Sequence, residues 1–402
     1  MKVKSVMVLT TSFPLNTCIA AGIHVLEKCR NLVKNGLDVT VIAPHSAQST
    51  KKETIEKIKV ERFIYFLPTR LQKLAYGPGI PTNLKQNFLA KFQLPLFLLA
   101  FLVKVILKAK RFDILHCHWS LAGLVGVIAG KLLNKKVVFM MHGAEAFVLG
   151  NHPMLRFVLK NCDYLISNST FTEKKTLDIY PVPNHSVVSP GVNLSRFYPQ
   201  HTIPNLREKL DIQHDHVFLL TIGKFIPRKG IEYLIEAMDI LINDKNYKKL
   251  RLRIGGRGPL KKKYQTLIIK YQLEDYIDFL PYIPDNDIPS YYTEADIFIL
   301  PSIVDENRDT EGLGVVFLEA NACATPVIGS RVGGIVDVIR DGINGYFVEQ
   351  KNAQDLAEKI AKLVDSKSLR FELGQKGEKR VRKHFNWDTN AKEIIKIYKE
   401  MI

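Results

Sequence analysis

The chain has 402 residues, which exceeds what one hydrophobic core usually serves, so we expect two domains of roughly 200 residues each. Apolar residues make up 46% and charged residues 24% of the chain, which is ordinary for a folded soluble protein. The five cysteines are scattered and form no CxxC pair, which argues against a disulfide framework or a structural zinc site and favours a reducing compartment. We expect no secretory signal peptide, because the first residues already have the pattern of a strand.

The net charge of +17 falls almost entirely on the first half of the chain. Residues 1–200 hold 26 Lys and Arg against 10 Asp and Glu, whereas residues 201–402 hold 31 against 30. A polyanionic partner for the first half would explain this asymmetry, and anionic lipid, a phosphorylated substrate and nucleic acid are the candidates. A general solubility charge is the alternative, but it gives no reason for the asymmetry.

Short apolar, β-branched runs alternate with helical stretches through the first half. Strands buried on both faces of a parallel sheet are predicted at 6–10, 38–44, 113–119, 136–142 and 164–169. A helix is predicted over His24 to Lys34, where Asn35-Gly36 ends it.

Glycine and histidine residues lie at the ends of these predicted strands. Gly22 lies in the first strand-to-helix loop, and His142 ends the strand at 136–142. His116 and His118 share one face of a strand, but no clear third ligand accompanies them, so metal binding is weakly supported.

The strongest apolar stretch is "FQLPLFLLAFLVKVILKAKRF", residues 92–112. Its uninterrupted run from Leu94 to Val103 is too short to span a bilayer and contains Pro95, so we expect no spanning helix. Two interpretations remain open. The segment is either a domain helix that is buried over most of its surface, or a helix that lies in a membrane surface with basic residues near the head groups.

The pattern restarts after about residue 200. Strands are predicted at 217–223, 250–256, 276–282, 296–302 and 326–330, with helical stretches between them. Repeated strand–helix–strand units indicate two doubly wound α/β domains, joined within the Pro-rich and polar segment 189–205. Ligands of such folds bind at the carboxyl ends of the strands, and we expect the site in the cleft between the domains.

The turn in "TIGKFIPRKGIEYLIEA" concentrates positive charge where a strand gives way to a helix. Gly223, Lys224, Arg228, Lys229 and Gly230 lie in it. Cations at a helix start form a good diphosphate site, since Arg can bond bidentately and Lys supplies a point charge. By itself, a basic loop of this kind is more often solvated surface.

Two further strand-to-turn segments carry glycine. "IGGRGP" (254–259) contains Arg257 and would let the backbone approach a flat ligand, although it lacks the spacing of a dinucleotide fingerprint. "EGLGVVFLEA" carries Glu311 and Glu319, which could grip different parts of one elongated ligand. A helix start with Thr310 as N-cap is the simpler explanation of that segment. The motifs of serine hydrolases, zincins and P-loop ATPases do not occur in the chain.

Together these stretches resemble one family. "GKFIPRKG", "EGLGVVFLEA" with the following "ACATPVIGSRVGGIVDVIRDGINGYFV", "SPGVNLSRFYP", "FDILHCHW" and "FNWDTNAKEIIKIY" resemble the retaining GT-B glycosyltransferases of family 4. The resemblance implies two facing Rossmann-like domains. Residues 1–200, completed by the helix 385–402, would bind the acceptor, and residues 201–384 would bind the nucleotide-sugar donor.

The resemblance also implies catalytic roles. Arg228 and Lys229 would hold the nucleotide diphosphate and stabilise its charge as the sugar bond breaks. Glu311 would bind hydroxyl groups of the donor sugar, and His142 would lie beside the transferred sugar. The family is thought to react by same-face attack, with a donor phosphate oxygen taking the acceptor proton. We therefore nominate no nucleophile, and Glu311 stays open as the candidate carboxylate.

The donor-binding residues that the resemblance implies surround this centre. Glu319 would bind the ribose, and Gly22 would let the first loop reach the diphosphate. The other members of the set are Gly223, Lys224, Arg257, Leu313, Gly314 and Val315. Where Lys224 stands the family often has Arg, which leaves Arg228 as the bidentate partner.

The sequence thus predicts a cytoplasmic, retaining hexosyltransferase that needs no metal or other cofactor. It would use a UDP- or GDP-linked sugar and a glycan or lipid-linked acceptor, with peripheral contact to an anionic membrane through its basic half and no nucleic-acid partner. A transferase with a soluble acceptor, such as a sugar phosphate or glucan, is the first alternative. A nucleotide-sugar epimerase of the same fold and a non-catalytic sugar-nucleotide binding protein are the others.

Overall fold

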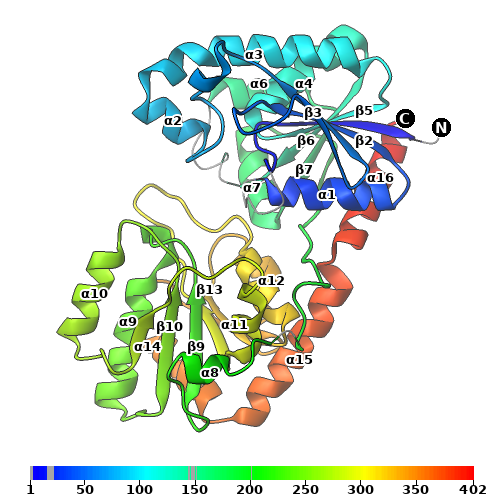
Figure 1. The fold of residues 1–402 in the computed structure, drawn as a ribbon. Helices are drawn as coiled ribbons and strands as arrows, with labels where there is room; N and C mark the ends of the chain where they lie inside the picture. The colour runs from blue at the N-terminus through cyan, green and yellow to red at the C-terminus, as the bar shows by residue number, and fades with distance from the viewer. Residues whose placement is uncertain (1–2, 16–21, 144, 146–149, 151, 201) are drawn as a thin grey trace. The chain divides into compact units, whose positions relative to one another are not determined.

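The computed structural model describes residues 3–15, 22–143, 145, 150, 152–200 and 202–402. The chain divides into two compact α/β units, which Figure 1 shows as ribbons. The first unit comprises Met1–Pro190 and Trp387–Ile402, and the second comprises Gly191–Asn386. The division thus falls ten residues before the expected boundary near residue 200, and the final helix belongs to the first unit.

Among the described residues of the first unit, the sheet has eight strands in the order β3-β4-β2-β1-β5-β6-β7-β8, and only the β3–β4 pair is antiparallel. Since β1 pairs with both β2 and β5, the winding of the chain changes direction between β1 and β5. The strands are β1 (Ser5–Thr10), β2 (Asp38–Pro44), β3 (Lys52–Ile55), β4 (Ile58–Phe63), β5 (Ile114–His118), β6 (Lys136–Met141), β7 (Tyr164–Ser167) and β8 (His185–Val187).

Helices cover both faces of this sheet (Figure 1). Successive side chains of β1 point to opposite faces of the sheet, so this strand contributes to the hydrophobic core on each face. Met7 and Leu9 pack with α3 and α4, whereas Val8 packs with α1 and α16. The helices are α1 (Ile23–Lys34), η1 (Thr69–Leu71), α2 (Ile80–Gln86), α3 (Phe88–Ala109), α4 (Ser120–Leu133), α6 (Pro153–Asn161), α7 (Thr170–Ile179) and α16 (Trp387–Met401).

The sheet of the second unit is fully parallel, with the order β11-β10-β9-β12-β13-β14, and its winding changes direction between β9 and β12. The strands are β9 (Val217–Ile222), β10 (Leu250–Gly255), β11 (Ile277–Phe279), β12 (Ile297–Leu300), β13 (Val327–Ser330) and β14 (Gly345–Val348). The helices are α8 (Leu206–Lys209), η2 (Pro227–Lys229), α9 (Ile231–Asp239), the π-helical η3 (Ile240–Asp244), α10 (Lys261–Lys270), α11 (Ile288–Glu294), α12 (Val315–Ala322), α13 (Ile335–Val338), α14 (Ala353–Val364) and α15 (Lys367–His384).

Each of the ten predicted strands is present, because a continuous apolar run is what a strand buried on both faces requires. One expectation about a helix is wrong, and the structure excludes one of the two interpretations left open for another helix. Helix α12 begins at Val315 with Gly314 as its N-cap, so Thr310 caps no helix and Glu311 precedes it. Helix α3 is not mostly buried: only 28% of its most apolar window lies inside the protein.

Candidate functional site

The candidate site of the second unit lies where two loops leave neighbouring strands. The loop 223–230 follows β9, and the loop 301–314 follows β12, the strand with which β9 pairs at the change of winding. Doubly wound sheets bind their ligands at this kind of switch point. The predicted cationic residues lie on the first loop, and Glu311 lies on the second.

One carboxylate connects the two loops. The Oε1 atom of Glu311 lies 2.6 Å from Lys229 Nζ and 2.6 Å from Arg228 Nη1. It also accepts a longer hydrogen bond from Ser302 Oγ, at 3.4 Å. Arg228 Nε makes a second ion pair with Asp309, at 3.1 Å. The structure therefore brings together three of the four predicted catalytic residues.

Glu311 and Lys229 are both 7% exposed, so their ion pair is shielded from solvent. Burial acts to raise the pKa of Glu311, but the neighbouring charges of Lys229 and Arg228 outweigh it and hold that pKa below its ordinary value. The carboxylate is therefore ionised at neutral pH. It is the shared ion-pair partner of Lys229 and Arg228, and Arg228 is also paired with Asp309.

Glycine allows the backbone to pack closely around this centre. A Cβ atom on Gly333, which has φ +55°, would lie 2.2 Å from the carbonyl oxygen of Glu311. The N–H of the next residue, Gly334, donates to the same carbonyl at 2.9 Å. On the other side, a Cβ on Gly256 would lie 1.8 Å from the carbonyl oxygen of Gly223. Gly333 thus lets the loop after β13 pack against the loop that carries Glu311, and Gly256 lets the loop after β10 pack against the loop after β9.

Glu319 lies inside α12 and makes a separate contact. Its Oε2 atom accepts a hydrogen bond of 3.1 Å from the hydroxyl of Tyr292, which is fully buried on α11. Burial raises the pKa of Glu319 to about 7, although the bond from Tyr292 acts to lower it. Among the described residues this carboxylate makes no ion pair within 4 Å, although the charge of Arg196 also acts to lower its pKa. It is thus available to a ligand that donates hydrogen bonds.

The other predicted donor-binding residues of this unit lie on the same two loops, at the start of α12 and on the loop after β10. Gly314 is the left-handed N-cap of α12, with φ +87°, and Val315 begins the helix with a 40% exposed side chain. Leu313 is buried in the core beneath the loop. Lys224 and Arg257 are exposed on the loops after β9 and β10, and the carbonyl of Arg257 accepts the N–H of Phe225 at 2.9 Å.

The first unit contains a histidine cluster at its own change of winding, between β1 and β5. His142 follows β6, and its Nε2 lies 2.9 Å from Nδ1 of His118, at the end of β5. His116 stacks on His118 with ring centroids 4.7 Å apart, and its Nδ1 contacts the hydroxyl of Tyr398 from α16. In the described parts of the chain, no group of three or more His, Cys, Asp or Glu is placed to hold a metal ion.

Burial keeps this cluster neutral. It lowers the pKa of His142 and of His118 well below the ordinary histidine value, and the neighbouring Lys28 and histidines lower it further. Burial also lowers the pKa of Lys28 to about 7. Gly22, the left-handed N-cap of α1, has φ +80°, and a Cβ there would lie 2.6 Å from the carbonyl oxygen of Ser12.

Several residues at these two centres were not predicted. Tyr292 and Asp309 contact Glu319 and Arg228, but neither has a spacing that would relate it to its partner. Lys28 lies on α1, and the sequence pattern of that helix does not distinguish it from an exposed lysine. Its burial depends on the packing of α1 against the sheet. Glu145 could have been noticed, since it follows the His142-Gly143 pair. Its carboxylate accepts hydrogen bonds from the backbone and hydroxyl of Ser120.

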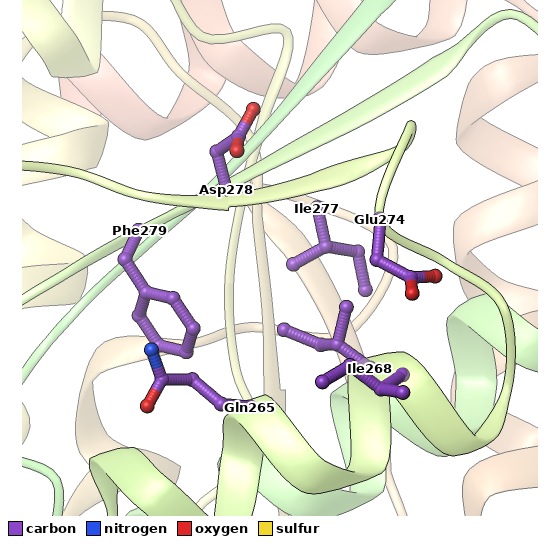
Figure 2. Close-up of a pocket in the computed structure, with 7 residues that line it drawn as sticks. Gln265, Ile268, Glu274, Ile277, Asp278 and Phe279 are labelled. Atoms are coloured by element: carbon purple, nitrogen blue, oxygen red, sulfur yellow. The ribbon is translucent and has the colours of Figure 1, made fainter.

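A hollow on the second unit, of about 210 Å³, lies between α10 and β11 (Figure 2). Most of its surface is apolar, and none of the predicted site residues lines it. The residues that line it are Gln265, Ile268, Ile269, Glu274, Ile277, Asp278 and Phe279.

Each of the two units matches the model of a known protein family. The model of Glycosyltransferase Family 4 matches residues 21–196, and that of Glycosyl transferases group 1 matches residues 202–380. An uncharacterised glycosyltransferase of Methanocaldococcus jannaschii is 31% identical over 303 residues, which cover 74% of this chain and 78% of the relative. A D-inositol 3-phosphate glycosyltransferase of Acidothermus cellulolyticus is 26% identical over 100% of this chain and 90% of its own length.

The solved structure of sucrose-phosphate synthase from Thermosynechococcus elongatus has the same fold, with a TM-score of 0.79, 22% identity and 99% coverage of both chains. Two parallel doubly wound units of this kind define the GT-B class of glycosyltransferases. This chain belongs to glycosyltransferase family 4, and it is an enzyme of the hexosyltransferase type. The predicted family, fold class and enzyme class are confirmed.

Proposed function

We propose that the enzyme transfers a hexosyl unit, with retention of configuration, from a UDP- or GDP-linked sugar to a glycan or lipid-linked acceptor. The reaction would serve the biosynthesis of cell-surface polysaccharide or glycolipid at the cytoplasmic face of the membrane. The observation that supports transfer from a nucleotide sugar most directly is the buried cluster of Arg228, Lys229 and Glu311 at the switch point of the second unit.

The chemistry of a departing nucleoside diphosphate fits this cluster. Negative charge develops on the diphosphate as the sugar bond breaks, and two preorganised cations can stabilise it. Arg228 offers a planar fork of donors and Lys229 a compact charge, so together they suit a diphosphate. In this proposal the diphosphate replaces Glu311 as their partner. The two side chains then supply the charge that a metal ion provides in other transferases, and no metal is required.

The remaining residues of the second unit would orient the donor. The released carboxylate of Glu311 can accept hydrogen bonds from sugar hydroxyls, and the unpaired carboxylate of Glu319 can accept them from a ribose diol. The N-terminus of α12, at Val315, favours a nearby anion through the helix dipole. In the first unit, His142 is neutral and would act as a hydrogen-bonding group beside the transferred sugar.

A panel of nucleotide sugars in a thermal-shift assay would identify the donor, because a tight ligand raises the melting temperature by mass action. With that donor, Lys229→Ala should lower kcat by roughly 10²-fold or more, as expected for the loss of one preorganised charge. Glu319→Ala should mainly weaken nucleotide binding. The matched control is Lys376→Ala, which removes an exposed charge in the same unit. Wild-type rate and affinity in both site variants would refute the assignment.

A soluble acceptor is the second candidate. The names of two similar proteins, a D-inositol 3-phosphate glycosyltransferase and a sucrose-phosphate synthase, favour a sugar phosphate or polyol phosphate in this role. Product analysis with the identified donor separates the candidates: a lipid-extractable product supports the lipid-linked acceptor, and a water-soluble product with these phosphates supports the alternative. Conversion of the donor sugar without any acceptor would instead indicate an epimerase.

A further inference from the structure

Helix α3 has one face in the core of the first unit and an opposite face that is open to solvent. On the core side, the rings of Phe101 and Phe63 stack with centroids 4.4 Å apart, and Phe97 and Val105 are fully buried. On the open side, large apolar side chains recur every three or four residues and form one stripe, roughly 28 Å long from the helical rise. They are Phe88, Phe92, Leu96, Leu99, Val103 and Leu107, each between 45% and 74% exposed.

The core face holds this helix in place. Gln93 accepts the N–H of Lys73 at 2.9 Å and donates to the carbonyl of Leu71 at 2.6 Å. Near the other end, Lys104 pairs with Glu61 of β4 at 2.6 Å. Within the described residues, α3 is the one helix long and apolar enough to cross a membrane by length and composition. Because one face of the helix, with Phe97, Phe101 and Val105, is buried in the core, a crossing would remove it from the core, whereas lying flat on a membrane would not.

The chain segment that contains the stripe carries charge of one sign only. Residues 62–112 contain nine Lys and Arg and no Asp or Glu. Three of these cations pair with acids of the preceding strands: Arg62 with Glu53, and Lys104 and Lys108 with Glu61. The others make no ion pair with any described residue. They are Arg70, Lys73, Lys85, Lys91, Lys110 and Arg111.

We propose that the open face of α3 docks on an anionic membrane, with the helix parallel to the bilayer plane. The apolar stripe would enter the boundary between head groups and acyl chains, and the unpaired cations would contact lipid phosphates. A second copy of the chain fits less well, because two such faces would bring like charges together without any acid between them. The inference adds to the proposed function by naming the surface that meets a lipid-linked acceptor. It does not depend on catalysis, and its failure would leave the transferase proposal standing.

Co-sedimentation of the full-length protein with vesicles tests this docking. The wild type should bind vesicles of equal parts phosphatidylcholine and phosphatidylglycerol, and it should bind pure phosphatidylcholine far more weakly. The double variant Phe92→Ser/Leu99→Ser should lower the partition coefficient by at least about tenfold, because two large apolar side chains no longer enter the lipid. The variant Lys85→Gln/Lys91→Gln should lower it by roughly tenfold at low salt, and high salt should remove this difference.

Matched variants control for general surface effects. Ile269→Ser removes an exposed apolar side chain, 63% exposed, from a helix of the second unit and should leave binding unchanged. Lys174→Gln/Lys175→Gln removes two exposed charges from α7 of the first unit and should change binding much less than the α3 pair does. The proposal is overturned if the wild type does not bind anionic vesicles, or if the α3 variants bind as tightly as these controls. A wild-type dimer that Phe92→Ser/Leu99→Ser converts to a monomer would also overturn it and assign the face to self-association.

Discussion

Glu311 neutralises two cations at once, so Glu311→Gln is the most informative single substitution in the second unit. Arg228 would keep its ion pair with Asp309, but Lys229 would have no remaining ion-pair partner among the described residues. Removing one partner of a buried ion pair lowers the free energy of unfolding by about 3–5 kcal/mol. Because Arg228 keeps its pair with Asp309, we expect a loss near the lower end of this range, at about 3 kcal/mol. For a unit of this size we expect the melting temperature to fall by roughly 6–12 °C.

Scanning calorimetry of the variant and the wild type measures this change on the transition of the second unit. Addition of UDP or GDP should recover more of the melting temperature in Glu311→Gln than in the wild type, because the diphosphate supplies the missing negative charge. The control is Glu372→Gln, which breaks an exposed pair with Lys376 on one helix and should change the unfolding free energy by no more than about 0.5 kcal/mol.

The pH dependence gives an independent check. Because the folded pKa of Glu311 lies below its ordinary value, its carboxylate contributes stability above the unfolded pKa, near 4.3. That contribution is lost as the pH falls through the folded pKa, so the wild type and Glu311→Gln should become similar in stability at acid pH. Equal melting temperatures at neutral pH, or a difference that persists unchanged into acid, would refute the reasoning.

Three further predictions concern the surroundings of this centre. Burial raises the pKa of Glu319 to about 7, so its carboxylate ionises between pH 6 and 8. Nucleotide affinity, measured by calorimetric titration, should therefore rise by up to about tenfold over this range. The variant Glu319→Gln should show no such rise. Gly333→Ala places a Cβ 2.2 Å from a backbone oxygen and should lower the melting temperature. Gly342→Ala is the control and should lower it less, because Gly342 has a similar positive φ but a Cβ there would meet no atom within 4 Å. Equal effects of the two substitutions would contradict this account. Because His142 is neutral, its titration should not appear in the kcat profile between pH 6 and 8, and His142→Ala should lower kcat while leaving the nucleotide Kd unchanged.

The sequence was sufficient to predict the strands at the centre of each sheet. A strand such as β1 or β9 is buried on both faces, and that burial requires the continuous apolar run that is visible in the letters. The strands that were not predicted are short or lie toward the edges of a sheet. No residue of β3 or β8 is fully buried, which leaves a weak apolar pattern, whereas β14 is buried but is a short strand at the edge of its sheet.

The site was predictable as a set of residue types but not as a set of contacts. Glycines and charges after strands identified the loops of Arg228 and Glu311, because the ends of parallel strands meet at one edge of a sheet. The direct ion pairing between them could not be predicted, since it depends on loop conformations that the glycines permit. The start of α12 was misplaced for the same reason: Gly314 adopts a left-handed conformation that ends the loop four residues after Thr310.

The last helix of the chain has a consequence for the order of folding. Ala391, Ile394 and Tyr398 of α16 are buried in the core that α1 and the first sheet also line. Residues 191–386 form the second unit without a break, so that unit needs no residue from either end of the chain to complete its core. The first unit is encoded at both ends and must wait for the final residues before one face of its sheet is covered. We therefore expect the domain that is translated first to complete its folding last.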